Sequence, residues 1–315
     1  MITITRGPPY LTIQDRGRKH SRSWGVPPGG AMDSFALQAA NAILGNDPGA
    51  AALEWALGGG SLHFERECLI ALAGAAVRST LSGRDVAPCT ATIAEKGDEL
   101  VVEQIVSGRF LYIAFSGGID VPSLLGSRAT YLPGRFGGLN GRMVRTADTL
   151  SFHPAPTTSP APGFHCAADL MPRYDSEIVH LIQGPQQDLF DDSARLDLTE
   201  SEYRISPASD RTGYRLDGKV ILSPPAGLPS EAGCPGAVQV PPDGAPIVLM
   251  ADAPTIGGYP KIGVVMAADL PILAQRRPGE RIRFEAITIE KSQRALERRH
   301  SDLLAILRLA ARSAG

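Results

Sequence analysis

Glycine and proline divide this chain into short segments, and this feature limits its fold more than any other. The 315 residues include 34 Gly and 26 Pro. Between them lie short runs of residues that favour β-strands, each ended by turn residues. These runs cover 10–14, 61–65, 68–74, 99–105, 109–118, 178–184, 202–206, 237–240, 245–250, 261–265 and 281–289. The pattern predicts a mainly β protein.

Two segments have the pattern of helices instead. Residues 34–44 present an apolar face, with Asp33 placed to cap the first turn and Gly45 placed to end the helix. Residues 291–312 combine five leucines with many arginines, which is typical of an amphipathic helix. We expect this second helix to pack on its own protein rather than on a membrane surface.

A proline-rich stretch at 153–163 has the composition of a linker. An alternating strand follows a turn both before it ("TADTLSFH") and near the end of the chain ("PGERIRFEAI"). We therefore expect two related β-domains, each closing into a barrel or sandwich. The expected divisions are an N-terminal domain at 1–153, a linker at 154–175, a C-terminal domain at 176–290 and a helical tail at 291–315.

Composition narrows the class of protein. The formal net charge is −2, whereas nonspecific nucleic-acid binding requires a basic face. The four cysteines are far apart without C-x-x-C spacing, the first residues do not resemble a signal peptide, and the longest apolar run, 69–77, is too short to cross a bilayer. We expect a cytoplasmic protein that binds neither nucleic acid nor membrane.

Six glycine-rich loops each carry charged residues, at 14–18, 25–33, 115–122, 125–142, 206–216 and 251–263. Glycine allows a backbone N–H to approach a ligand closely, and Arg or Lys on the same loop supplies charge for a phosphate or carboxylate. Any single loop of this kind is more often a plain turn with an internal salt bridge. Six of them on a β scaffold favour at least two loops lining one site.

The loop "GVPPGGAMD" at 25–33 leads directly into the first expected helix. A helix N-terminus concentrates free N–H groups and the positive end of the helix dipole. Asp33 either only caps this end, or caps it while Gly29 and Gly30 face a ligand. A second segment, 213–220, fits G-x-x-x-x-G-K, but Val220 stands where a P-loop needs Ser or Thr. We interpret that segment as a turn with an exposed lysine.

Together these loops resemble one protein family. The resemblance runs through "TIQDRGR", "GVPPGGAMD", "FSGGIDVPSLLGSRAT", "FGGLNGR", "YRISPASDRTGYRLDG" and "VQVPPDGAPIVLMADAPTIGGYPKIG", over roughly residues 3–290. The family is allophanate hydrolase subunit 2, also called KipA, which supplies one of the subunits of 5-oxoprolinase and is related to the carboxyltransferase region of urea carboxylase. The resemblance implies two β-domains with cyclophilin-like barrel character.

It also implies a function within a complex. The chain would act as the KipA-type subunit of an ATP-dependent 5-oxoprolinase, using ATP with Mg²⁺ shared with a KipI-type partner. The two would phosphorylate 5-oxoproline, and a LamB/YcsF-type partner would complete hydrolysis to glutamate. Two alternatives remain: a carboxyltransferase component that works with a biotin carrier, and a non-catalytic antagonist of a KipI-type kinase inhibitor.

The charged loops supply the expected site residues. Reaction by phosphoryl transfer needs positioning and positive charge more than a protein nucleophile. We expect Asp120, Arg211, Asp252 and Lys261 to act in catalysis, with the two aspartates handling Mg²⁺ or protons. The expected contacts to phosphate or carboxylate are Arg128 and Arg142 through their side chains, and Gly117, Gly118, Gly257 and Gly258 through their backbone.

Overall fold

The chain forms two units, each built on its own β-sheet. The computed structural model describes residues 1–222 and 228–314. The first unit comprises Met1–Arg18, Asp33–Pro172 and the residues from His300 onward, and the second comprises Lys19–Met32 and Arg173–Arg299. The loop that precedes the first helix therefore groups with the second unit, away from its neighbours in sequence.

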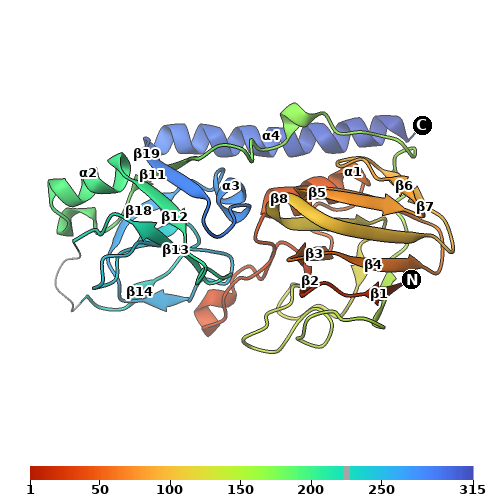
Figure 1. Cartoon of the computed structure of the whole chain (residues 1–315), viewed down its shortest axis with the longest axis horizontal. Coiled ribbons are helices and arrows are strands. Elements are labelled where there is room, and N and C mark those ends of the chain that lie inside the picture. Colours follow the sequence, from red (N-terminus) through yellow and green to blue (C-terminus); the bar gives the residue numbers. More distant parts are fainter. Residues whose placement is uncertain (223–227, 315) are drawn as a thin grey trace. The chain divides into compact units, whose positions relative to one another are not determined.

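The first unit is a ten-stranded antiparallel sheet with one short helix packed on it (Figure 1). Its central order is β2-β3-β8-β4-β1-β10-β9, and β5 pairs with β6, β7 and β8. Its elements are β1 (Ile2–Arg6), β2 (Tyr10–Gln14), α1 (Ser34–Ile43), β3 (Ala52–Ala56), β4 (Gly60–Phe64), β5 (Cys68–Leu81), β6 (Arg84–Asp85), β7 (Thr92–Ala94), β8 (Glu99–Phe115), β9 (Ile119–Asp120), β10 (Thr149–Phe152) and the 3₁₀ turn η2 (Ala168–Leu170).

The second unit is a closed barrel in the order β11-β18-β15-β16-β13-β12-β19. A separate two-stranded ribbon, β14 with β17, belongs to the same unit. Its elements are η1 (Ser21–Trp24), β11 (Ile178–Gln183), η3 (Gln187–Leu189), α2 (Asp192–Glu200), β12 (Glu202–Ile205), β13 (Gly213–Gly218), β14 (Glu231–Ala232), β15 (Ala237–Gln239), β16 (Ile247–Leu249), β17 (Ile256–Gly257), β18 (Lys261–Val265), α3 (Leu270–Ala274) and β19 (Arg281–Ala286).

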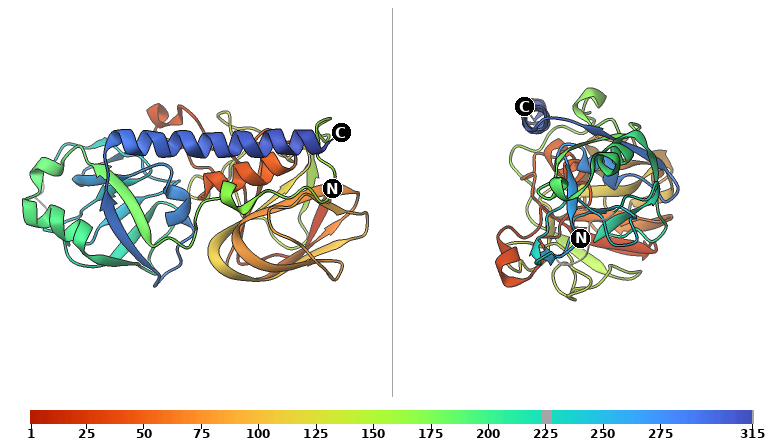
Figure 2. Two further views of the ribbon diagram at one scale, coloured as in Figure 1. Left: turned by 90° about the horizontal axis from the view of Figure 1, so that it is seen from above. Right: turned by 90° about the vertical axis from the view of Figure 1, so that its left-hand side faces the viewer.

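A long C-terminal helix, α4 (Ile289–Ser313), completes the chain and is continuous in both views of Figure 2. Leu303, Ile306 and Ala310 are its buried residues, and their spacing places them on one face. The amphipathic pattern of the sequence therefore has its counterpart in a helix that packs on protein. No helix among the described residues has the length and apolarity that crossing a membrane requires.

The two β-domains and the C-terminal helix confirm the fold class expected from the sequence. Strands β2 and β18 have the bounds that their residue pattern predicts. The segment that resembles a P-loop is strand β13, and no helix follows it directly. Strand β8 differs from the expectation, because the two runs at 99–105 and 109–118 form one strand of 17 residues.

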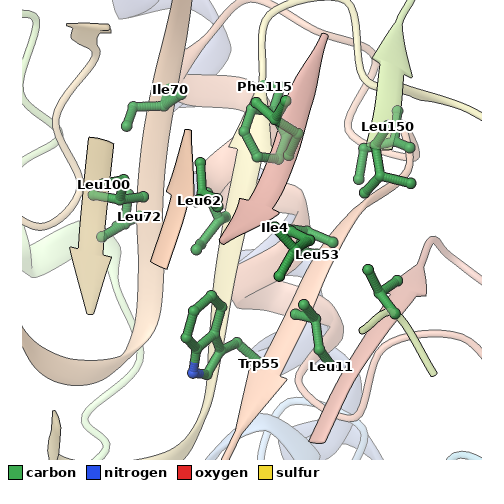
Figure 3. Close-up of a cluster of buried hydrophobic side chains, with 14 of the residues drawn as sticks. Ile4, Leu11, Leu53, Trp55, Leu62, Ile70, Leu72, Leu100, Phe115 and Leu150 are labelled. Atoms are coloured by element: carbon green, nitrogen blue, oxygen red, sulfur yellow. The ribbon is translucent and has the colours of Figure 1, made fainter. Parts of the chain in front are cut away.

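Alternating apolar residues of the first-unit strands form a buried core (Figure 3). Trp55 at its centre is fully buried, and its indole N–H donates to the carbonyl of Gly58 at 3.0 Å. The rings of Phe115 and Phe152 stack with centroids 4.7 Å apart. Because Phe115 ends β8 and Phe152 ends β10, this packing fixes the ends of two strands from which the loops described below emerge.

Asp33 caps helix α1 as its sequence position predicts. Its Oδ1 accepts a hydrogen bond from the backbone N–H of Ala36 at 2.9 Å, and its backbone N–H donates to the Tyr112 hydroxyl oxygen at 2.8 Å. We expect Asp33→Ala to lower the free energy of unfolding by about 1–2 kcal/mol, and Asp33→Ser to retain most of it, since serine is also a good N-cap. Urea denaturation measures the difference, and equal stability of Asp33→Ala and the parent protein would contradict this role.

Candidate functional site

A polar cavity of about 340 Å³ lies in the first unit, where several loops meet. The segment after α1, the turn after β8 and the residue that follows β10 form its walls. Its lining consists of Asp47, Gly49, Ala50, Ala51, Gly117, Gly118, Ile119, Arg128 and His153. Three residues expected from the sequence, Arg128, Gly117 and Gly118, are therefore brought together here.

The turn at Gly117 and Gly118 builds one wall of this cavity. Both residues have positive φ angles, +90° and +73°. A Cβ on Gly117 would collide with the backbone oxygen of His153, so the close approach of these two segments requires glycine. The Asn46 side chain accepts from the N–H of Gly117 at 2.8 Å, and the N–H of His153 donates to the Gly118 carbonyl at 3.1 Å. These bonds place the imidazole at the cavity.

Asp15 and Val121 hold Arg128 in place. Asp15 accepts hydrogen bonds from the backbone N–H of Arg128 at 2.6 Å and from the Ser127 hydroxyl at 2.6 Å. The Nε of Arg128 donates to the Val121 carbonyl at 3.0 Å, and among the described residues this is the side chain's one hydrogen bond. Its terminal amino groups therefore retain their N–H donors.

Asp120 lies next to the cavity rather than in its lining. Its Oδ1 is 3.4 Å from Nε2 of His153, and about half of its side chain is exposed. The Nε2 atom itself is enclosed and has no hydrogen-bond partner among the described residues. The sequence analysis did not select His153, because its position at the start of a proline-rich stretch is typical of a linker.

Arg142 is held elsewhere in the first unit. Its guanidinium donates two hydrogen bonds to Asp148, at 2.6 and 2.8 Å, and is not part of the cavity lining. The hydrogen bonds from Arg142 hold the pKa of the Asp148 carboxyl below its ordinary value, with further support from the Arg145 backbone N–H. In turn the same contact raises the pKa of Arg142.

This pair predicts a pH dependence of stability. A carboxyl whose pKa is depressed in the folded state stabilises the fold above its unfolded pKa of about 3.9, and the gain is lost as pH falls through the native value. We therefore expect Arg142→Gln to lower the free energy of unfolding near neutral pH and to lose this effect progressively below about pH 4. Denaturation of both proteins across this range measures it, and a difference that stays constant with pH would contradict the prediction.

In the second unit, Arg211 forms a buried ion pair with Asp252. Two nitrogens of the guanidinium donate to the two carboxylate oxygens, at 2.8 and 3.1 Å, and the side chains are only 11% and 6% exposed. A terminal nitrogen of Arg211 also donates to the Gly30 carbonyl. Both expected site residues therefore meet, and they anchor the loop "GVPPGGAMD" to the second unit.

Lys261 forms another polar cluster of the second unit. Its ammonium group is 3.0 Å from Oε2 of Glu231 and 3.4 Å from Oε1 of Gln186. The Lys261 side chain is 5% exposed and that of Glu231 is 50% exposed, so the cation is enclosed and its partner reaches solvent. The hydrogen bond from Lys261, followed by its charge, lowers the pKa of Glu231.

The glycines expected beside Lys261 lie on the same ribbon as Glu231. Gly257 pairs with Glu231 in the β14–β17 ladder. A Cβ on Gly258 would meet nothing closer than 3.7 Å, so its backbone is accessible. Glu231 and Gln186 were missed from the sequence because neither stands on a glycine-rich loop with a charged motif.

A larger cavity in the second unit has a different character. It measures about 880 Å³ and is enclosed by α2, the end of β11 and the start of α4. Its walls are largely apolar, with Leu181, Leu198 and Ile287 among them, and none of the residues expected to act in catalysis lines it. Size alone therefore does not identify the chemical site of this protein.

Comparison with known proteins identifies the family. Residues 24–286 match the family described as "Carboxyltransferase domain, subdomain A and B". The chain belongs to this family. Among the relatives of this carboxyltransferase-domain protein is the 5-oxoprolinase subunit designated C in Escherichia coli (strain K12), 35% identical over 296 residues, which are 94% of each chain. The protein of the same name from Haemophilus influenzae is 34% identical over 93% of each chain.

A solved relative extends the comparison to the fold. The Kluyveromyces lactis urea amidolyase is 28% identical and superimposes with a TM-score of 0.89 over 97% of this chain. The match covers only 20% of that longer protein. The fold described above is therefore that of one region of urea amidolyase, and it occurs as a separate subunit in the bacterial relatives.

Proposed function

We propose that this chain is the KipA-type subunit of an ATP-dependent 5-oxoprolinase, acting with a KipI-type partner and a LamB/YcsF-type partner. One observation carries the proposal: the chain and the E. coli 5-oxoprolinase subunit align over 94% of both lengths at 35% identity. A match over the full length of a separate subunit supports this role more strongly than a match to a fifth of a longer enzyme.

The reaction explains why ATP is needed. A five-membered lactam is a stabilised amide that water attacks slowly. In the proposed reaction the γ-phosphoryl group of ATP is transferred to the lactam oxygen, which activates the carbon. Water then adds to that carbon, and the ring C–N bond breaks to give an acyl phosphate of glutamate. A second water releases phosphate and leaves glutamate.

Lys261 is the residue of this chain that best suits a transferring phosphoryl group. Preorganised cations stabilise the charge that develops in such a transfer and act most strongly where water is excluded. The ammonium group of Lys261 is enclosed, while its partner Glu231 reaches solvent. In the proposal, an incoming phosphate displaces Glu231 from Lys261, and the accessible backbone of Gly258 borders the same site.

The aspartates expected to handle Mg²⁺ do not fit that purpose. Both oxygens of Asp252 are bonded to Arg211, and Asp120 stands beside His153. Across residues 1–222 and 228–314, no group of three His, Cys, Asp or Glu side chains is arranged to hold a metal ion. The described residues thus provide no Mg²⁺ site, and we assign this chain no step that depends on one.

The test is ATP consumption by the purified chain mixed with its KipI-type and LamB/YcsF-type partners. We expect hydrolysis that depends on 5-oxoproline and on all three proteins, with one glutamate formed per ATP. Omission of this chain is the matched control. Equal rates with and without it would overturn the proposal.

Carboxyl transfer from carboxybiotin is a second candidate, favoured by the family description and by the TM-score of 0.89 to urea amidolyase. It requires a biotin carboxylase and a biotin carrier protein. Under this alternative avidin abolishes ATP consumption and the acceptor is urea-like. Under the leading proposal avidin has no effect.

A further inference from the structure

The cavity of the first unit presents groups of both charges to a small volume. Arg128 and Asp47 are both part of its lining, and His153 adds an imidazole. A carboxylate and a guanidinium that face one space without pairing are suited to a ligand that carries an acceptor and a donor of its own.

Arg128 has the donors that such a ligand needs. Its side chain uses only Nε within the described part of the protein, in the bond to the Val121 carbonyl. The planar guanidinium matches the two oxygens of a carboxylate, and a charge-assisted contact of this kind is among the stronger hydrogen bonds in proteins.

Asp47 and His153 supply the complementary groups. Oδ1 of Asp47 accepts from the Gly49 backbone N–H at 2.6 Å, which fixes the carboxylate, and in residues 1–222 and 228–314 its Oδ2 has no hydrogen-bond partner. The enclosed Nε2 of His153 likewise lacks a partner across those residues. Buried polar atoms of folded proteins are nearly always bonded, so an unsatisfied one at a cavity wall indicates a missing ligand or water.

The volume restricts the ligand further. About 340 Å³ is at the lower end of the range for small-molecule pockets, which is roughly 300–1,000 Å³. A single small ring or a short amino acid suits this space, whereas a nucleotide does not.

We propose that this cavity binds a small carboxylate that carries a neighbouring N–H group, the class that includes 5-oxoproline and glutamate. Arg128 holds the carboxylate, Oδ2 of Asp47 accepts from the N–H, and Nε2 of His153 bonds a carbonyl or carboxylate oxygen of the ligand. The naming of 5-oxoproline rests on the proposed function, but the binding can be measured on this chain alone.

Isothermal titration of the purified chain tests the proposal with three matched probes. 5-Oxoproline has the carboxylate and the N–H, 2-pyrrolidinone has only the N–H, and cyclopentanecarboxylate has only the carboxylate. We expect 5-oxoproline to bind about 10- to 100-fold more tightly than either of the other two, because each lost charged contact is worth about 1.5–3 kcal/mol.

Variants locate the binding. Arg128→Gln is expected to weaken 5-oxoproline binding by about 10- to 100-fold, and Asp47→Asn to reduce the preference for it over cyclopentanecarboxylate. Arg84→Gln, an exposed arginine of the same unit, is the control and is expected to bind normally. If Arg128→Gln does not fold, Arg128→Lys takes its place, since lysine keeps the charge but cannot bind a carboxylate in bidentate fashion.

The outcomes separate this proposal from the proposed function. A 5-oxoproline Kd weaker than about 10 mM for the parent chain, or one unchanged in Arg128→Gln, would overturn the binding site. Turnover of 5-oxoproline by the three-protein mixture in either case would leave the proposed function standing. Binding that is lost in Arg128→Gln, together with no turnover, would support the site and refute the function.

Discussion

Replacing Arg211 with methionine is expected to lower the free energy of unfolding of the second unit by about 3–5 kcal/mol. The substitution leaves the Asp252 carboxylate, only 6% exposed, without its cation. It also removes the donor to the Gly30 carbonyl and so releases the loop at 25–33. Denaturant unfolding followed by circular dichroism measures the loss.

Two further variants separate the ion pair from general disruption. Arg211→Met combined with Asp252→Leu removes both charges, and we expect it to recover much of the lost stability, because a buried pair replaced by apolar residues is often neutral. Arg283→Gln, which breaks an exposed pair with Glu202, is expected to change stability by less than about 1 kcal/mol. A loss for Arg211→Met no larger than that of Arg283→Gln would refute the anchoring role.

Lys261→Met is expected to lower kcat of the assembled enzyme by about 10²–10³-fold, the usual effect of losing one preorganised donor to transition-state charge. The fold should survive, because the carboxylate left behind belongs to Glu231, whose side chain is half exposed and can be solvated. Steady-state ATP consumption with the KipI-type and LamB/YcsF-type partners measures the loss.

Lys219→Met is the matched control for this prediction. Lys219 is an exposed lysine of the same unit that pairs with Asp197 at 3.4 Å, and it is also the lysine of the segment that resembles a P-loop. We expect normal turnover for this variant. Normal turnover for Lys261→Met as well would remove Lys261 from the catalytic site.

The fold class could be predicted because local signals agree with the tertiary structure. The short β-favouring runs bounded by turn residues became strands, and Asp33 caps α1. Strand β8 was predicted as two because Ser107–Gly108 has the composition of a turn. In the structure Gly108 has a positive φ of 77°, and register shifts in the β5–β8 ladder nearby absorb the irregularity without ending the strand. Helix α2 escaped prediction because it is polar and only two of its residues, Ala194 and Leu198, are buried.

Long-range pairings set the limit for the candidate sites. The sequence pointed to Arg211 and Asp252 separately, but their bond spans 41 residues and the bond from Arg211 to Gly30 spans 181. Glu231 and His153 depend on similar distant contacts, with Lys261 and with the turn at Gly117. Motif spacing reports on neighbours along the chain, so it selects the loops but not the partners that meet there.

The most direct test of the central claim uses 5-oxoproline labelled with ¹⁸O in its lactam carbonyl. The complete three-protein mixture is supplied with ATP, and the inorganic phosphate is analysed by mass spectrometry. Transfer of the phosphoryl group to the lactam oxygen, with later attack of water at carbon, predicts phosphate that carries one ¹⁸O atom. Phosphate free of the label, formed while glutamate accumulates, would contradict this account.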